Sequence, residues 1–204
     1  MLQFHALSGL TVTDADRPVT IGGPRQRRLL AMLLIHRNSV VSVDRLAEAV
    51  FAGEPTPGAR TTLRSYVARM RRVVGREGSG ATLLTQAPGY LLRLPDEAFD
   101  VARFESLLGE AATRMAAGEA AAAAEALRAA RDLWRGEPYA EFADEDWAGP
   151  EAQRLTELRL VAHERLIDAE LVRGRAAELI PEIDAQVHAH PLRESFRCQL
   201  MLAL

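Results

Sequence analysis

The sequence predicts a mixed fold: an N-terminal winged helix-turn-helix domain of the α+β class over residues 1–95, and an all-α, tetratricopeptide-like domain over residues 96–204. Short strand patterns occur only in the first part, whereas the second part has helical patterns throughout. The charge divides at the same place, because residues 1–95 carry 13 Arg against 6 acidic residues and residues 96–204 carry 12 Arg against 22. Such an asymmetry often marks a nucleic-acid-binding half joined to an interaction half.

Strand and helix signals alternate at the start of the chain. Three short strand candidates lie at residues 2–7, 10–13 and 19–21. A helix is expected from Pro24, because proline fits the first helical turn, and a second short helix from Ser42 or Val43. Residues 53–58 (GEPTPG) contain two prolines and two glycines and therefore predict a loop.

A third helix is expected over residues 59–74, closed by Gly75. Two β-rich runs follow, at residues 82–85 and 90–94, and they flank a Gln-Ala-Pro-Gly turn at residues 86–89. Three small helices followed by a hairpin are typical of a winged helix.

The second half predicts two helix pairs and a fifth helix after Pro191. The pairs cover residues 101–117 with 119–134, and 151–173 with 176–188. Gly118 and Gly174 break the pairs, and the small-residue faces resemble stacked helical repeats. The small-residue face consists of Ala116, Ala120, Ala123, Ala126 and Ala130. An acidic insertion at residues 136–149 separates the two helix pairs. Within it, the acidic residues 141–146 predict a solvated loop, which could touch a basic partner. Because the chain stops inside an apolar helical run, we expect a fragment of a longer protein.

The helix over residues 59–74 has two contrasting faces. At about 100° per residue, its apolar stripe holds Ala59, Leu63, Tyr66, Val67, Met70, Val73 and Val74. The opposite side holds Thr61, Arg64, Ser65, Ala68, Arg69 and Arg72, with Arg60 and Arg71 on a flank. No acidic residue lies between Glu54 and Glu77, although like charges four apart repel. We therefore expect the compensating negative charge to come from outside the chain.

Duplex DNA carries such a charge, and its major groove admits one helix. Arginine bonds the two acceptors of guanine, and the short side chains of Thr61, Ser65 and Ala68 would let the helix approach the bases. The alternative is an ordinary solvated basic face, and the adjacent loop and hairpin favour DNA over it. Arg25, Arg27 and Arg28 lie in the first turn of the helix from Pro24, where the helix dipole is unfavourable for cations. A phosphate docked at this helix end would offset that penalty. The alternative is that three exposed arginines cost little stability.

Other function classes find little support. The sequence contains no phosphate-binding loop, no Gly-x-Ser-x-Gly elbow and no metal-spaced cluster, so neither an enzyme, a metal nor a cofactor is expected. His163, His188 and His190 are expected to be surface or packed residues, and Trp134 and Trp147 core anchors. No apolar run is long enough to span a bilayer, and Cys198 is the single cysteine, so we expect a cytoplasmic protein.

Several segments together resemble the Streptomyces antibiotic regulatory protein (SARP) family. In the first half they are residues 22–27 (GGPRQR), 40–46 (VVSVDRL), 63–74 (LRSYVARMRRVV) and 88–92 (PGYLL), which look like an OmpR-type winged helix. In the second half they are residues 100–104, 133–136, 154–155 and 190–194, which resemble a bacterial transcriptional activation domain.

The resemblance implies an activator that binds direct repeats near promoter −35 elements as side-by-side dimers and recruits RNA polymerase. It implies that the major groove is contacted by Thr61, Arg64, Ser65, Arg69 and Arg72. It implies that the wing contacts the DNA backbone through Thr85, Gln86, Gly89 and Arg93. Arg60, Arg71 and Arg25 complete the expected DNA-binding set. Two alternatives remain: a helical interaction scaffold, and a signal-sensing repressor with the same DNA-binding domain.

Overall fold

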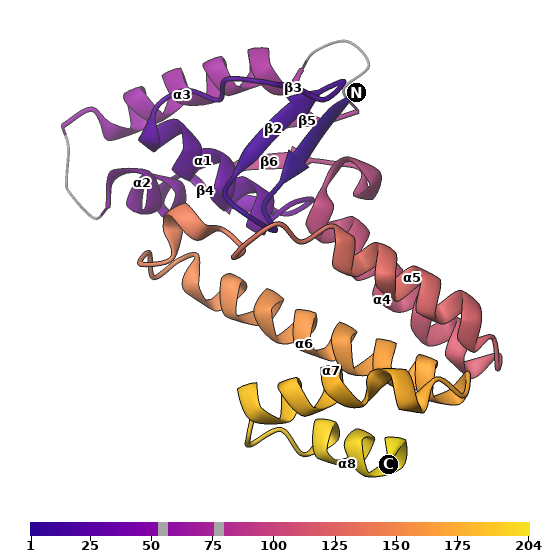
Figure 1. The fold of residues 1–204 in the computed structure, drawn as a ribbon. Helices are drawn as coiled ribbons and strands as arrows, with labels where there is room; N and C mark the ends of the chain where they lie inside the picture. Colours follow the sequence, from indigo (N-terminus) through magenta and orange to yellow (C-terminus); the bar gives the residue numbers. More distant parts are fainter. Residues whose placement is uncertain (53–56, 76–79) are drawn as a thin grey trace. The chain divides into compact units, whose positions relative to one another are not determined.

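The computed structural model describes residues 1–52, 57–75 and 80–204, which form two compact units (Figure 1). The first unit comprises Met1–Arg103 and Arg135–Arg154, and the helical unit comprises Phe104–Trp134 and Leu155–Leu204. The expected domain boundary between residues 95 and 96 stays a prediction. Residues 135–154 differ from expectation, because they group with the first unit instead of forming an insertion within the helical half.

A three-stranded antiparallel sheet opens the first unit. Its strands are β1 (Leu2–His5), β2 (Thr11–Asp14) and β3 (Arg17–Pro18), in the order β1-β2-β3. Ala15 and Asp16 both have positive φ angles, of 46° and 64°, as a two-residue type I′ turn requires. This turn pairs Arg17 with Asp14 directly. The third strand therefore comes earlier than the predicted one, and the expectation of a strand at residues 19–21 was wrong.

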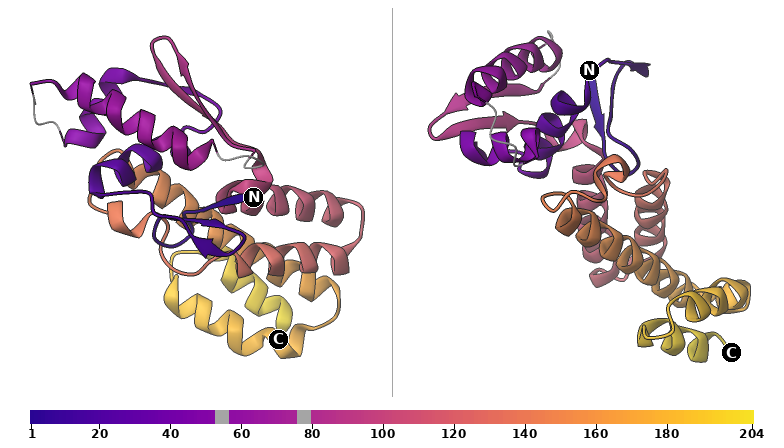
Figure 2. Two further views of the ribbon diagram at one scale, coloured as in Figure 1. Left: turned by 90° about the horizontal axis from the view of Figure 1, so that it is seen from above. Right: turned by 90° about the vertical axis from the view of Figure 1, so that its left-hand side faces the viewer.

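Three helices and a second sheet form the winged helix of the first unit (Figure 2). The helices are α1 (Pro24–Ile35), α2 (Val43–Phe51) and α3 (Ala59–Val74), and the strands are β4 (Val40–Ser42), β5 (Thr82–Gln86) and β6 (Gly89–Arg93), in the order β4-β6-β5. The three helices and the hairpin of β5 and β6 confirm the predicted winged helix. The sequence analysis missed β4, because three residues are too few to show an alternating pattern. Of the predicted loop at residues 53–58, residues 53–56 lie outside the described residues.

Local signals in the sequence set where α1 and α2 begin. Pro24 occupies the first turn of α1, and the side-chain oxygen of Gln26 accepts a hydrogen bond from the Gly23 amide at 2.8 Å. The Ser42 hydroxyl caps α2 by accepting a hydrogen bond from the Arg45 amide at 3.2 Å. The apolar faces of the helices form the core of the winged helix. Its buried residues include Leu29, Leu30, Leu33, Leu34, Leu46, Val50, Leu63, Val67 and Met70.

Two residues that follow the winged helix in sequence, Asp100 and Tyr139, bond to the backbone directly after β1. Tyr139 is fully buried, and its amide donates a hydrogen bond to the Ala6 carbonyl at 2.9 Å. Asp100, the first residue of α4 (Asp100–Ala116), is also buried, and its carboxylate accepts hydrogen bonds from the amides of Ala6 and Leu7 at 2.9–3.1 Å. Burial raises the pKa of Asp100 to about 6, although these hydrogen bonds oppose the shift. Short 3-10 helices lie beside these residues, at η1 (Asp96–Ala98) and η2 (Ala140–Phe142).

The helical unit is built from antiparallel helix hairpins, as predicted. After α4 come α5 (Ala120–Asp132), α6 (Gly149–Val172), α7 (Ala176–Ala189) and α8 (Glu194–Ala203). Gly118 and Gly174 each have a φ of 77°, a left-handed conformation that ends α4 and α6. Four of the five predicted small-face alanines are buried, and Ala116 is exposed. Pro181 lies inside α7 without interrupting it.

The last three helices share an apolar core around Ile167, Ile183 and Phe196. Exposed apolar side chains remain at Leu192 and Met201. Among the described residues, no helix combines the length and hydropathy that a membrane span requires.

Candidate nucleic-acid interface

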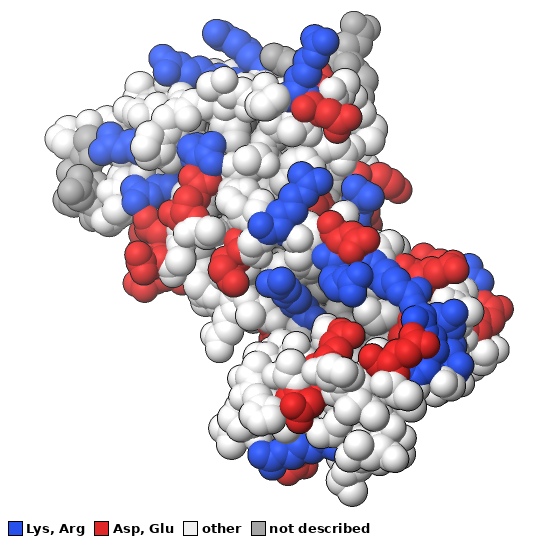
Figure 3. All heavy atoms as spheres, viewed as in Figure 1, with Lys and Arg blue, Asp and Glu red and all other residues white. Residues whose placement is uncertain are grey.

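Helix α3 separates its apolar and basic side chains onto opposite faces, as its sequence pattern predicts. Its buried residues are Leu63, Val67, Met70 and Val74. The residues on the other side, including Thr61, Arg64, Ser65, Arg69 and Arg72, are exposed. Figure 3 shows basic side chains projecting along the upper edge of the view, where α3 lies. The exposed face therefore combines long cations with short polar side chains.

Three of these arginines have no acidic partner in the part of the chain that the structure describes. Within residues 1–52, 57–75 and 80–204, no carboxylate forms an ion pair with Arg64, Arg69 or Arg72. Arg69 and Arg72 are three residues apart on the helix, a spacing at which like charges repel by a few tenths of a kcal/mol. The outer face of α3 thus keeps uncompensated positive charge available for a ligand.

Arg60 differs from these three residues. Its Nη2 lies 2.7 Å from a carboxylate oxygen of Asp44 on α2. Because the two side chains are 71% and 78% exposed, this pair contributes at most about 1 kcal/mol. The expectation that no arginine of this helix finds an acid within the chain was therefore wrong for Arg60. The partner of Arg60 lies on another helix, so the sequence pattern of α3 alone does not reveal it.

Arg71 is a structural link between α3 and the hairpin. Its Nε donates a hydrogen bond to the Leu83 carbonyl at 2.9 Å, and its Nη2 donates to the Thr85 hydroxyl at 2.6 Å. Arg71 and Thr85 are both predicted DNA-binding residues, and the structure pairs them with each other. The sequence analysis missed this role, because it depends on the position of β5 beside α3.

The hairpin contributes the remaining predicted residues. Gln86 and Arg93 are exposed, whereas Gly89 is buried. A Cβ atom at Gly89 would lie 1.8 Å from the Val41 carbonyl oxygen, so β4 and β6 can pair only if this position is glycine. Gly89 thus has a packing role, and contact of the hairpin with DNA stays a prediction.

The first turn of α1 is already partly neutralised. Its ion pairs are Arg27–Glu141, with 2.5 Å between Nη2 and Oε1, and Arg28–Glu145. The run at residues 141–146 was expected to be a solvated loop that could touch a basic partner, and it binds the basic end of α1. Arg25 has a different environment, because its guanidinium lies 5.3 Å from the centroid of the Phe51 ring. Arg25 is exposed, and a phosphate contact at this helix end stays a prediction for it.

The other residues singled out in the sequence are histidines and tryptophans. Among the described residues, no group of three or more His, Cys, Asp or Glu is placed to hold a metal ion. The ring centroids of His163 and His190 each lie 6.0 Å from the ring centroid of Phe196. Trp134 is buried, as expected for a core anchor, whereas Trp147 is only half-buried.

Two family models match successive parts of the chain. The family model for the C-terminal domain of transcriptional regulatory proteins matches residues 17–92, and that for the bacterial transcriptional activator domain matches residues 99–204. The regulatory protein DnrI of Streptomyces peucetius is 31% identical over 210 residues, which cover 100% of this chain and 77% of DnrI. The chain belongs to the Streptomyces antibiotic regulatory protein family. Both matching models describe transcription regulators, and neither is a catalytic family.

This SARP-family chain also resembles longer regulators. The transcriptional regulatory protein EmbR of Mycobacterium tuberculosis is 37% identical over 204 residues, which cover 99% of this chain and 53% of EmbR. A solved structure of that protein in complex with a low affinity phosphopeptide matches with a TM-score of 0.91, over 99% of this chain and 54% of the solved chain. The chain therefore spans about half the length of EmbR.

Proposed function

We propose that the chain is a DNA-binding transcriptional regulator that places α3 in the major groove of promoter DNA. The main support for this proposal is that Arg64, Arg69 and Arg72 are exposed on one face of α3 and have no carboxylate partner among the described residues. Each guanidinium can bond the O6 and N7 acceptors of guanine, and DNA supplies the negative charge that the helix lacks.

The surroundings of α3 support this proposal. Thr61 and Ser65 are exposed and short, so the helix axis can come close to the base edges. Arg71 ties β5 to α3, so the hairpin is fixed beside the recognition helix and its exposed residues Gln86 and Arg93 can contact the phosphate backbone. Phosphate contacts of this kind set the register of a protein on DNA, and base contacts set its sequence preference.

The proposal extends to the biological role. Two copies bind direct repeats near a −35 element side by side, and the chain activates transcription in the cytoplasm by recruiting RNA polymerase. Activation is favoured over repression because the family model that matches residues 99–204 is that of an activator domain. Family membership supports dimers on DNA and polymerase recruitment.

Selection of bound sequences from a pool of random duplexes tests the DNA-binding role. We expect enrichment of a spaced direct repeat, because each copy reads one half-site with α3. Binding without any sequence preference would instead favour the interaction-scaffold alternative, in which the basic face is incidental.

Substitution of Arg69 tests the assignment of α3. We expect Arg69→Ala to weaken binding to the selected duplex by about 1–3 kcal/mol and to relax the preference at one base position. Fluorescence anisotropy titrations with the selected duplex and its single-base variants measure both effects. Arg165→Ala is the matched control, because Arg165 is an exposed arginine on α6 in the helical unit. An unchanged base preference for Arg69→Ala would remove Arg69 from the interface.

A further inference from the structure

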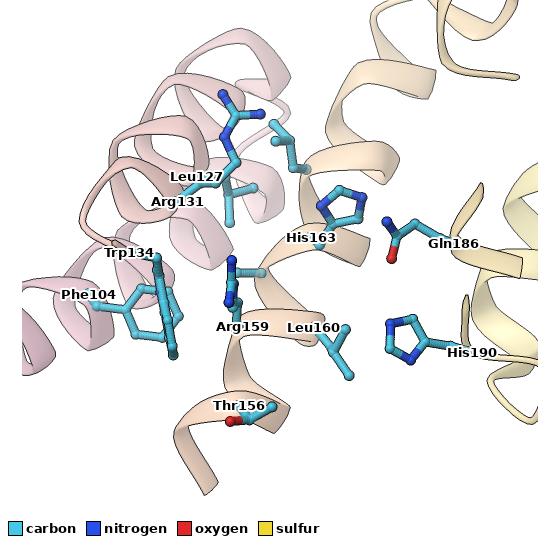
Figure 4. A pocket seen from close by; sticks show the side chains of 12 residues that line it. Phe104, Leu127, Arg131, Trp134, Thr156, Arg159, Leu160, His163, Gln186 and His190 are labelled. Atoms are coloured by element: carbon cyan, nitrogen blue, oxygen red, sulfur yellow. The ribbon is translucent and has the colours of Figure 1, made fainter. Parts of the chain in front are cut away.

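The helical unit contains a pocket of about 420 Å³ (Figure 4). This volume lies in the range of about 300–1,000 Å³ that is typical of small-molecule sites. Its apolar walls come from Phe104, Leu127, Trp134, Leu160 and Leu166. In Figure 4 the rings of Phe104 and Trp134 lie on one side, His163, Gln186 and His190 lie on the other, and Arg159 lies between them. The pocket thus joins aromatic surface to several polar groups.

Two residues that line this pocket have a buried nitrogen without a hydrogen-bond partner among the described residues. The first is Nε1 of Trp134, whose side chain is 9% exposed. The second is Nε2 of His163, which lies 3.3 Å from a Glu182 oxygen without forming a hydrogen bond with it. A buried donor without a partner costs about 1–3 kcal/mol, and most buried polar groups are paired. The indole N–H of Trp134 is therefore a buried donor that the described residues leave unpaired.

Two cationic side chains line this pocket. Arg131 and Arg159 are among its lining residues, and none of the lining residues is acidic. The Arg159 guanidinium lies 5.0 Å from the centroid of the Trp134 ring, so one cation is held over the aromatic wall. Burial lowers the pKa of His163, and the charges of Arg131 and Arg159 act in the same direction while Glu182 opposes them. His163 therefore favours its neutral form, and the two arginines alone favour an anion over a cation.

We propose that this pocket binds a small organic anion with a flat apolar body. The body lies against the Trp134 ring and the leucines, and a carboxylate or similar group accepts hydrogen bonds from the guanidinium of Arg159. The pocket is lined entirely by the helical unit, so this inference goes beyond the DNA-binding role and does not depend on it.

Nuclear magnetic resonance of the ¹⁵N-labelled chain tests the site, because the sequence contains two tryptophans and so gives two indole N–H signals. The probes are 1-naphthylacetate, which carries a carboxylate, and the neutral 1-naphthylacetamide of nearly the same shape. We expect the acid to shift the Trp134 signal at lower concentration than the amide and to leave the signal of Trp147, in the first unit, unchanged. Trp147→Phe assigns the two signals.

A pair of substitutions tests the role of charge. We expect Arg159→Gln to weaken binding of the acid about tenfold, because it removes a charge-assisted hydrogen bond. Arg165→Gln on the same helix removes an exposed arginine that does not line the pocket and should have no effect. A Trp134 signal that does not move at millimolar acid, or equal affinities for acid and amide in the unmodified chain, would overturn the proposal. Equal effects of the two substitutions would also overturn it.

Discussion

Arginines on one helix have different roles in this protein. Arg60 pairs with Asp44, Arg71 holds the hairpin, and Arg64 is exposed without an acidic partner among the described residues. Their sequence spacing reveals which face of α3 they occupy. The partners that distinguish them lie on α2 and β5, so only the tertiary structure separates structural arginines from those available for DNA.

Substitution of Arg71 tests this distinction at the level of stability. We expect Arg71→Ala to lower the free energy of unfolding by about 1 kcal/mol, because it removes the hydrogen bonds to Leu83 and Thr85. Arg72→Ala removes a neighbouring exposed arginine and should change stability by less than about 0.5 kcal/mol. Urea unfolding followed by circular dichroism measures both. Equal destabilisation would show that Arg71 does not anchor the hairpin.

The buried Asp100 carboxyl predicts a dependence of stability on pH. Burial raises its pKa from the ordinary value of 3.8 to about 6, so the folded chain binds its proton more tightly than the unfolded chain does. The contribution of the protonated Asp100 carboxyl to stability is fully present below pH 3.8 and is lost as the pH rises through about 6. We expect the stability of the parent relative to Asp100→Asn to fall by about 2 kcal/mol between about pH 4.5 and about pH 7.5. Urea unfolding at a series of pH values measures this difference.

His5 requires a control in that experiment. Its Nδ1 lies 3.9 Å from a carboxylate oxygen of Asp100, and burial lowers its pKa, with the charges of Arg135 and Arg103 acting in the same direction. His5 therefore contributes the opposite slope, because its folded form binds its proton less tightly. Repeating the comparison in a His5→Gln background isolates the carboxyl. A difference that does not vary with pH in that background would contradict a raised pKa at Asp100.

At the scale of elements, the sequence predicts long periodic segments well and short paired ones poorly. Helix α3 and its buried face follow from spacing alone, because sixteen residues of amphipathic pattern leave little choice. Strands β3 and β4 have two and three residues, and each forms because a neighbouring strand or turn offers it a partner. These two strands are stabilised by pairing with another strand, so no local sequence pattern predicts them.

Gly89 shows how such pairing depends on a single position. We expect Gly89→Ala to lower the free energy of unfolding by more than about 2 kcal/mol, because the added Cβ would meet the Val41 carbonyl oxygen at 1.8 Å and push β4 from β6. Gly109→Ala is the control: Gly109 is exposed inside α4, its Cβ would meet nothing within 4 Å, and alanine should stabilise that helix by about 1 kcal/mol. Thermal unfolding of both variants measures the effects. A tolerated Gly89→Ala would show that the strands can separate without loss.

At the scale of the whole molecule, position in the chain does not decide which unit a segment joins. Residues 135–154 follow two helices, yet they belong to the first unit through buried Tyr139 and the Arg27–Glu141 ion pair. The acidic composition of this segment suggested a solvated loop. Composition could not reveal that its carboxylates neutralise arginines of α1, because those arginines lie more than a hundred residues earlier.

The division of charge between the halves leads to a test of whether local or overall charge controls DNA binding. One double substitution replaces Arg64 and Arg72 of α3 with Gln, and a second replaces Arg165 and Arg197 of the helical unit with Gln. Each removes two positive charges from a chain whose net charge is −3. Charges further away than a screening length of about 8 Å contribute little at physiological salt. The α3 pair should therefore weaken binding to the selected duplex at least about tenfold and reduce the dependence of log affinity on log salt by up to about two, whereas the other pair should change neither. Anisotropy titrations at several salt concentrations decide between the two explanations, because equal losses for both pairs would mean that overall charge, rather than the exposed face of α3, controls binding.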